Sequence, residues 1–338
     1  MTIRPIDPVA LVDPELRPAL DRMILESPSP EARITPDALR SIRARGAATQ
    51  KPFLREPGVA ARTIGVPDAP DLALFVINAD PASTKPAILH LHGGGFVAGS
   101  AGGSVADMQV IAKALECVVV TVEYRLAPET SFPGALDDNY AALRWVFDHA
   151  AELGVDRDRI ALLGESAGGG HAAMLALAAR DRGEVAASFL ALSCPMLDDR
   201  TGKSVRLPPH LGAFVWRPAL NAAAWSALLG DSEGRGPVPA READLSGLPP
   251  IFIGTGSVDL FAPENIAFAG RLVEAGVPVE LLVVPGAFHA FDTLAPHARA
   301  SRRYRLALLN ALARAFGRAE LATPPEPAPP LFAGIAAA

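Results

Sequence analysis

Cysteine is scarce in this sequence, which contains only Cys117 and Cys194. Both lie inside apolar runs, and this position predicts two buried thiols. Two isolated cysteines exclude a disulfide framework and a cysteine-rich metal cluster. The chain therefore does not need an oxidising compartment for folding.

Long apolar runs and an excess of basic residues are also lacking. No stretch reaches the length of a membrane span, and proline and aspartate interrupt the N-terminal segment where a signal peptide would be continuously apolar. The formal net charge of −6 gives no basic footprint for nucleic acid or anionic membranes. We expect a soluble, cytoplasmic protein that binds a neutral small molecule, with neither nucleic acid nor membrane insertion among its interactions.

Apolar residues, in contrast, are abundant: half of the 338 residues are hydrophobic and a fifth are charged. From about residue 61, short apolar runs alternate with longer helical segments. Strands that are apolar on both faces and separated by helices predict an α/β fold with a mostly parallel sheet. The clearest predicted strands are Leu72 to Asn78, Ala87 to Leu91, Cys117 to Val122, Ile160 to Leu163, Ala187 to Leu192, Ile251 to Ile253 and Glu280 to Val284.

The spacing of these strands indicates an insertion. More than fifty residues separate Cys194 from Leu248, which is too long for a plain crossover connection. We predict that this segment, with a helix near Asn221 to Leu229, forms a cap together with N-terminal helices. The predicted division is 1–55 and 195–247 for the cap, 56–194 and 248–320 for the core, and 321–338 for a proline-rich extension.

A serine motif follows one of the predicted strands. Gly164-Glu165-Ser166-Ala167-Gly168 stands directly after Ile160 to Leu163 and opens a helical run. Strand, Gly-x-Ser-x-Gly and helix is the context of a nucleophile elbow, in which the serine occupies a strained turn. Ser166 is the predicted nucleophile.

A run of glycines follows another strand. His92-Gly93-Gly94-Gly95 comes immediately after Ala87 to Leu91, and glycines there allow backbone amides to approach a substrate oxygen without a Cβ atom between them. We assign the amides of Gly94, Gly95 and Ala167 to an oxyanion hole. His92 is expected to orient the loop by hydrogen bonding.

A nucleophilic serine needs a histidine base and an acid, in the chain order serine, acid, histidine for this type of fold. Of the four histidines after Ser166, only His289 stands in a loop after a strand; the others are His171, His210 and His297. We therefore predict His289 as the base.

Asp259 is the favoured acid because it follows the strand Ile251 to Ile253, one helix-and-strand unit before His289. Asp198 and Asp199 remain rivals, since they also follow a strand. The alternative for Asp259 is a helix N-cap ahead of Ala262, which is compatible with catalysis only if the carboxylate points inward.

These motifs together resemble the bacterial hormone-sensitive-lipase-like family of esterases. The resemblance rests on His92-Gly-Gly-Gly, Tyr124-Arg-Leu-Ala-Pro-Glu129, Gly164-Glu-Ser-Ala-Gly, the Asp259 segment and Phe288-His-Ala-Phe291. It implies the α/β-hydrolase fold, with an eight-stranded sheet, a helical cap and hydrolysis of short to medium acyl esters without a cofactor or metal. A homodimer through the edge strand Val279 to Val284 is a further expectation by analogy.

Other features within these motifs lead to narrower expectations. Glu165 departs from the commoner Asp or Thr of the family, and we expect it to rearrange a hydrogen bond near the site. Arg125 and Glu129 are expected to pair and hold loops together. Phe214, Trp216 and Trp225 either line a substrate pocket or form the core of the cap.

Two alternatives to an esterase remain open at this stage. An amidase or lactone hydrolase would use the same three residues. A non-catalytic small-molecule receptor on the same fold is the other alternative, and the presence of His289 speaks against it.

Overall fold

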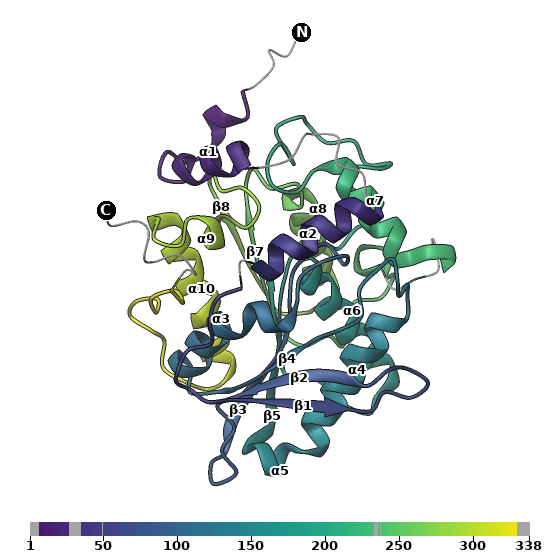
Figure 1. Ribbon diagram of the computed structural model, residues 1–338, viewed down its shortest axis with the longest axis vertical. Coiled ribbons are helices and arrows are strands. Elements are labelled where there is room, and N and C mark those ends of the chain that lie inside the picture. Colours follow the sequence, from purple (N-terminus) through teal and green to yellow (C-terminus); the bar gives the residue numbers. More distant parts are fainter. Residues whose placement is uncertain (1–6, 27–34, 49, 233–235, 237, 330–338) are drawn as a thin grey trace.

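A mixed sheet of eight strands organises the chain in the computed structural model, which describes residues 7–26, 35–48, 50–232, 236 and 238–329 (Figure 1). The strand order is β1-β2-β4-β3-β5-β6-β7-β8. Strands β3 to β8 are parallel, whereas β2 is antiparallel to both β4 and β1. The predicted eight-stranded, mostly parallel sheet is thus confirmed. The strands are β1 Val59–Ile64, β2 Leu72–Ile77, β3 Lys85–Leu91, β4 Val118–Val122, β5 Val155–Glu165, β6 Phe189–Ser193, β7 Ile251–Gly256 and β8 Val279–Val284.

Helices cover both faces of the sheet. Successive side chains of a buried strand point to opposite faces, so each face of the sheet has its own core. Leu89 and Leu162 belong to a core shared with α4 (Gly134–Asp148), α6 (Ala167–Arg182) and α8 (Ala262–Glu274). Their neighbours Ile88 and Leu163 belong to a second core with α3 (Ala101–Ala114) and α10 (Arg299–Ala315). The two-sided burial explains why the central strands read as continuous apolar runs.

Three further helices gather at one end of the sheet. Figure 1 shows α1 (Arg17–Glu26), α2 (Pro36–Ala48) and α7 (Pro218–Leu229) at the end opposite α5 (Ala150–Leu153). Helix α5 precedes β5, so the other three lie toward the carboxyl ends of the parallel strands. The boundaries of the cap stay a prediction, and residues 330–338 of the predicted extension lie outside the described residues.

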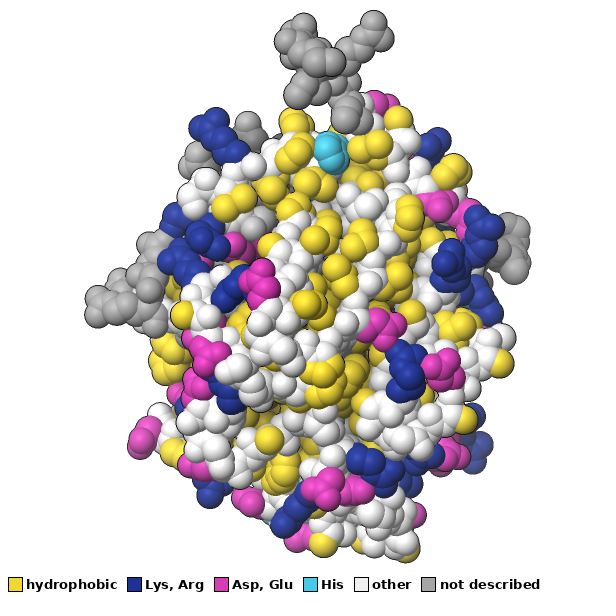
Figure 2. All heavy atoms as spheres, turned by 180° about the vertical axis from the view of Figure 1, so that it is seen from behind, with side chains coloured by type: hydrophobic (Ala, Val, Ile, Leu, Met, Phe, Trp, Pro, Cys, Tyr) yellow, Lys and Arg dark blue, Asp and Glu magenta, His cyan; other side chains and the backbone are white. Residues whose placement is uncertain are grey.

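Short elements complete the described chain: 3₁₀ turns at Val9–Leu11, Gly230–Ser232 and Pro239–Arg241, and the helix α9 (Phe291–Leu294). Both cysteines are buried and unpaired, as predicted. No helix among the described residues is long and apolar enough to cross a membrane. Over the described part of the face in Figure 2, basic and acidic side chains are interspersed, without a large area of one sign.

The predicted pair between Arg125 and Glu129 is wrong. Arg125 instead binds the buried carboxylate of Asp138 through Nε and Nη2, at 2.8 to 3.0 Å. Glu129 binds Arg43 of α2 at 2.8 and 2.9 Å. Both partners lie outside the Tyr124–Glu129 motif, one in α4 and one in α2. The motif therefore connects these two helices to the core, and its own two charged residues do not pair with each other.

Candidate active site

Ser166 lies on a sharp turn between β5 and α6. Its backbone has φ 53° and ψ −116°, a combination that costs of the order of 1–3 kcal/mol for a non-glycine residue. The turn is held by the Ser166 amide, which donates to the carbonyl of Ser193 at 2.8 Å. A Cβ atom at Gly168 would lie 1.9 Å from the carbonyl oxygen of Leu91. This close packing of strand, turn and helix is the geometry of a nucleophile elbow.

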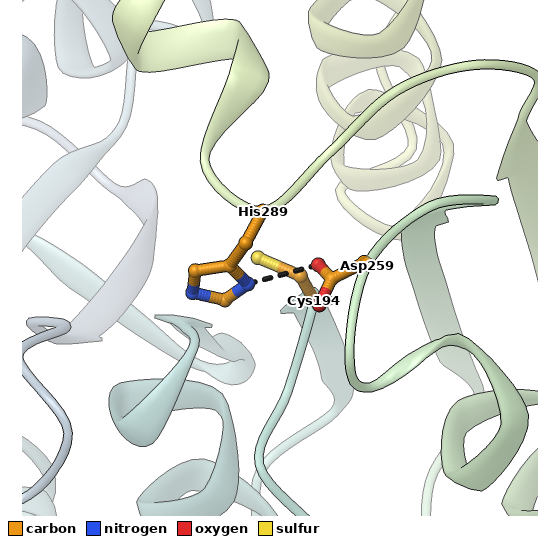
Figure 3. Close-up of side chains that lie close together, drawn as sticks. All are labelled: Cys194, Asp259 and His289. Carbon is orange, nitrogen blue, oxygen red and sulfur yellow. Dashed lines mark hydrogen bonds and ion pairs between the residues drawn. The ribbon is translucent and has the colours of Figure 1, made fainter. Parts of the chain in front are cut away.

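His289 joins Ser166 to Asp259 through both ring nitrogens. Nε2 lies 2.9 Å from the Ser166 hydroxyl. Nδ1 lies 2.8 Å from Oδ2 of Asp259 (Figure 3). The second carboxylate oxygen of Asp259 accepts the amide of Phe261 at 2.9 Å. The N-cap of α8 is Phe261, which has no side-chain cap, so the alternative of Asp259 as the helix N-cap is wrong. The Asp259 carboxylate points inward to the imidazole and also accepts the amide that precedes the helix.

The charge environment distinguishes His289 from the other buried histidines. Burial by itself lowers the pKa of His289, but Asp259 and Cys194 beside the imidazole together raise the pKa well above its ordinary value. Burial lowers the pKa of His92 to about 4 and that of His171 to about 3. His297 is 70% exposed at its side chain. His289 alone among these combines a serine on one nitrogen with a carboxylate on the other.

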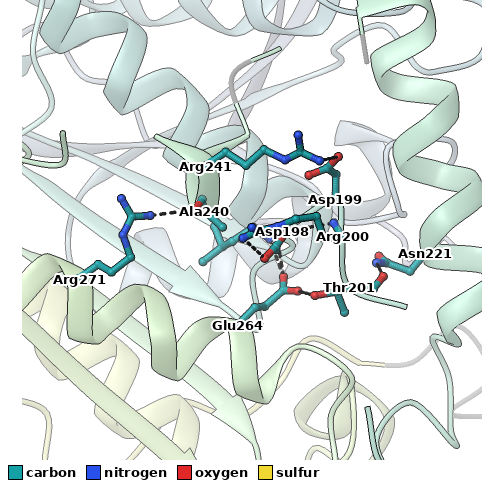
Figure 4. Close-up of polar contacts among 10 residues, drawn as sticks. Asp198, Asp199, Arg200, Thr201, Asn221, Ala240, Arg241, Glu264 and Arg271 are labelled. Atoms are coloured by element: carbon teal, nitrogen blue, oxygen red, sulfur yellow. Dashed lines mark hydrogen bonds and ion pairs between the residues drawn. The ribbon is translucent and has the colours of Figure 1, made fainter. Parts of the chain in front are cut away.

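The rival acids are engaged elsewhere. Asp198 binds Arg200 at 2.8 Å, and Asp199 binds Arg241 at 2.6 Å (Figure 4). Both aspartates lie in the loop that follows β6, near Glu264 of α8. The Glu264 carboxylate accepts the amides of Leu197 and Asp198 at 2.7 and 3.3 Å and also accepts the Thr201 hydroxyl. The two aspartates therefore belong to a network that fastens the inserted segment to α8.

The glycine loop packs directly against the elbow. A Cβ atom at Gly93 would lie 3.1 Å from the carbonyl oxygen of Glu165 and 3.7 Å from Cβ of Ser166. Gly94 has φ +131° and Gly95 φ +62°, which are conformations that glycine adopts without strain. Within the described residues, no hydrogen bond is found to the amides of Gly94, Gly95 or Ala167, which leaves three donors free near the serine.

His92 orients this loop, as expected. Its Nδ1 lies 2.8 Å from the carbonyl oxygen of Gly93 and its ring stacks on Tyr124 with centroids 4.1 Å apart. The Tyr124 hydroxyl donates to the carbonyl of His92 at 2.5 Å. Both bonds involve backbone carbonyl groups of the glycine loop, so His92 acts on the backbone of that loop.

The three candidate aromatic residues occupy different surroundings. Trp216 covers the glycine loop, because a Cβ atom at Gly95 would lie 2.0 Å from its ring. Phe214 is buried and packs edge-on against Phe288 at 6.3 Å. Trp225 is 1% exposed and packs against Phe96 with ring centroids 4.8 Å apart. Of the two alternatives for this residue, pocket lining or core, the structure places it in the core.

Glu165 contacts a residue that sequence reasoning missed. Its Oε2 lies 2.9 Å from Nε2 of the buried His90, whose Nδ1 lies 2.8 Å from the Thr121 hydroxyl. His90 interrupts the apolar run of β3, and a buried histidine needs polar partners on both nitrogens. A histidine within this apolar run, two residues before His92, was the signal in the sequence that could have indicated a buried polar contact here.

Comparisons with known proteins agree with this geometry. A family model described as the alpha/beta hydrolase fold matches residues 88–293. The carboxylesterase NlhH of Mycobacterium tuberculosis is 34% identical over 294 residues, which is 83% of this chain and 90% of that protein. The solved structure of a bacterial heroin esterase has a TM-score of 0.76 at 38% identity, covering 92% of this chain and 99% of the other. Esterase LipW from Mycobacterium marinum has a TM-score of 0.75 at 32% identity, over 91% and 97% of the two chains. The expected α/β-hydrolase fold is confirmed, and the chain belongs to the hormone-sensitive-lipase-like family of α/β hydrolases.

Proposed function

We propose that this carboxylic ester hydrolase is a serine carboxylesterase that cleaves short- to medium-chain acyl esters through an acyl-enzyme on Ser166. The observation that carries the proposal is the continuous chain of hydrogen bonds from Ser166 through His289 to Asp259. The relatives described above, a carboxylesterase and two esterases, support the choice of esters as substrates.

The reaction has two steps. Nε2 of His289 takes the hydroxyl proton of Ser166 as the oxygen attacks the ester carbonyl, and the same proton then leaves with the alcohol. Water attacks the acyl-enzyme in the second step, again with His289 as base. Asp259 keeps the Nδ1 proton of the imidazole in place and stabilises the imidazolium that forms in each step.

The developing oxyanion is bound by backbone amides of Gly94, Gly95 and Ala167. Ala167 is the first residue of α6, so the partial positive charge of the helix N-terminus acts at the same point. Fixed amides need no reorganisation as the charge develops, which is why donors of this kind contribute strongly to rate.

Gly94→Ala should lower turnover about a hundredfold or more, because the loss of one oxyanion donor has that effect. The added Cβ atom would lie 2.1 Å from the carbonyl oxygen of Ala98, so the loop has to shift and the amide of residue 94 leaves its present position. The measurement is kcat on a chromogenic butyrate ester. Gly65→Ala is the matched control, since nothing lies within 4 Å of a Cβ atom there. Equal rates in the two variants would remove Gly94 from the oxyanion hole.

The substrate class is tested by comparing matched ester and amide substrates and by covalent trapping. We expect turnover of short chromogenic esters and little turnover of the corresponding amides. A phosphonate ester should label Ser166 with one phosphonyl group per chain, which peptide mass mapping detects. Faster amide or lactone turnover would favour the second hydrolase class, and a folded protein that is neither active nor labelled would favour the receptor.

We also propose that Phe214 and Trp216 border the acyl or alcohol pocket. Trp216 carries the stronger case of the two, because its ring lies against Gly95. Its indole nitrogen donates to Asn221 at 3.1 Å, so the ring is held in one orientation beside the proposed oxyanion hole.

The homodimer is proposed for the free edge of β8. This strand pairs only with β7 among the described strands, and an unpaired edge favours association with another strand. A groove of about 550 Å³ with Leu282 and Tyr304 in its lining runs beside it. Light scattering should give twice the chain mass, and Leu281→Lys, at a residue 37% exposed, should shift the protein to the monomer. A monomeric wild type at working concentration would contradict this proposal.

A further inference from the structure

Cys194 brings a thiol to the other side of the His289–Asp259 pair. Ligand atoms of Cys194, Asp259 and His289 all lie within 4.8 Å of one another (Figure 3). Within the part of the chain that the structure describes, this is the one group of three histidine, cysteine or acidic side chains so arranged. All three residues are buried, and Nδ1 is the nitrogen of His289 that faces the carboxylate.

The backbone holds the thiol firmly in this position. Cys194 follows β6 with φ 38°, which is uncommon for a residue with a side chain. Its amide donates to the carbonyl of Gly254 at 2.6 Å. The left-handed conformation is therefore fixed by the neighbouring strand β7, and Sγ stays beside the imidazole.

We propose that Cys194, His289 and Asp259 form an inhibitory binding site for a soft divalent cation such as Zn²⁺ or Cd²⁺. The inhibition, though not the binding, rests on the proposed function of His289. Thiolate and imidazole ligands select Zn²⁺ and Cd²⁺ over Mg²⁺ and Ca²⁺, which prefer oxygen. The thiol proton leaves to solvent on binding, and the thiolate and carboxylate together neutralise the two positive charges of the ion. Such compensation is what a buried ion requires.

The spacing suits an ion of this size after a small adjustment. Bonds of about 2.0–2.3 Å in tetrahedral geometry separate ligand atoms by roughly 3.3–3.8 Å. Atoms up to 4.8 Å apart therefore need to approach by roughly 1.0–1.5 Å at most, and Nδ1 and Oδ2, now 2.8 Å apart, need to separate by roughly 0.5 Å. The fourth position would be taken by water, as in an open zinc site.

The bound ion stops catalysis through the tautomer of the imidazole. A metal on Nδ1 requires that nitrogen to be unprotonated, so the proton of neutral His289 resides on Nε2. Nε2 then faces Ser166 as a donor and has no lone pair to accept the hydroxyl proton. The metal also takes the carboxylate of Asp259 away from the imidazole. Inhibition should therefore lower kcat and be reversed by a chelator.

Cys117 provides an internal control. It is buried just before β4, and burial raises the pKa of its thiol to about 12, so it stays protonated. It belongs to no group of three potential ligands among the described residues. Cys117→Ala should leave both basal turnover and metal sensitivity unchanged.

The experiment is a titration of the wild-type enzyme with Cd²⁺, followed by the ultraviolet charge-transfer absorption of a cadmium thiolate and by ester turnover. We expect one Cd²⁺ per chain, with loss of turnover that EDTA restores. In Cys194→Ser and Cys194→Gly the absorption should vanish. The Zn²⁺ concentration for half-inhibition, each variant measured against its own metal-free rate, should rise about a hundredfold or more. The glycine variant suits the left-handed backbone, which guards against a folding defect.

The outcomes separate this site from the proposed function. Absorption and inhibition that both depend on Cys194 support the inhibitory site. Absorption in a protein that hydrolyses no ester would support the metal site and contradict the esterase. Absence of the thiolate band in wild type, or equal inhibition of wild type and both Cys194 variants, would overturn the proposal. Binding of Cd²⁺ that leaves ester turnover unchanged would contradict the inhibitory role of the site.

Discussion

Ser166→Ala is expected to lower kcat on a chromogenic butyrate ester by a factor of about 10⁵ to 10⁶, since serine hydrolases lose about that much without the nucleophile. The alanine variant keeps the amide of Ala167 and the glycine loop, so substrate binding should persist while acylation is lost. Phosphonate labelling should disappear as well. A variant that retains most of the wild-type rate would contradict the whole assignment.

Two further variants make this result specific. Ser188→Ala removes a hydroxyl, one residue before β6, that donates to the carbonyl of Ile160 in β5 at 3.1 Å. Ser188 is not part of the elbow, and turnover of the variant should match wild type. Ser166→Gly should be as inactive as the alanine variant yet more resistant to heat, because glycine adopts φ 53° without strain. Thermal melting of both variants distinguishes lost chemistry from lost folding.

Asp259→Asn is expected to lower kcat/KM about ten-thousandfold, because an amide stabilises the wrong tautomer of the imidazole and no longer offsets the charge of the imidazolium. The pH profile should change too. Neutral His289 is the active form, so activity is lost as pH falls through its pKa. Burial lowers that pKa, but Asp259 and Cys194 together raise it above its ordinary value, and the acid limb of wild type should therefore lie above about 6.5. In Asp259→Asn the limb should move toward lower pH.

Asp198→Asn is the matched control for this result. Its carboxylate binds Arg200, and the variant should keep the midpoint of the acid limb and most of its activity. If Asp198→Asn shifted the limb and Asp259→Asn did not, the acid would be Asp198. Rates measured across the pH range on one ester decide between them.

The sequence predicts the elements of the sheet well because their signal is local. Apolar runs such as Ala87 to Leu91 and Ile160 to Leu163 coincide with β3 and with the buried part of β5. The observed strand boundaries differ from the predicted ones by a few residues, because the apolar pattern and the hydrogen-bonded pairing end at different residues. Strand β6, for example, begins at Phe189 instead of Ala187.

Partners across the fold were not predictable in the same way. Glu129 binds Arg43, which lies 86 residues earlier, and a motif gives no information about a helix so distant in the chain. The contact between Glu165 and His90 spans 75 residues. The position of Cys194 beside His289 depends on the order β6, β7, β8 within the sheet. Chain order predicted the serine, acid and histidine, but distances between side chains needed the assembled sheet.

The position of His289 after the last strand also determines when a newly made chain can become active. The elbow and the glycine loop follow β5 and β3, so a chain that has emerged from the ribosome only as far as β6 already contains the proposed nucleophile and oxyanion donors. It still lacks β7 and β8, and with them both Asp259 and His289. Domains form as units once their strands are available. With the proposed roles of Asp259 and His289, hydrolytic capacity arises in a single late step of biosynthesis, and truncated translation products carry an inert serine.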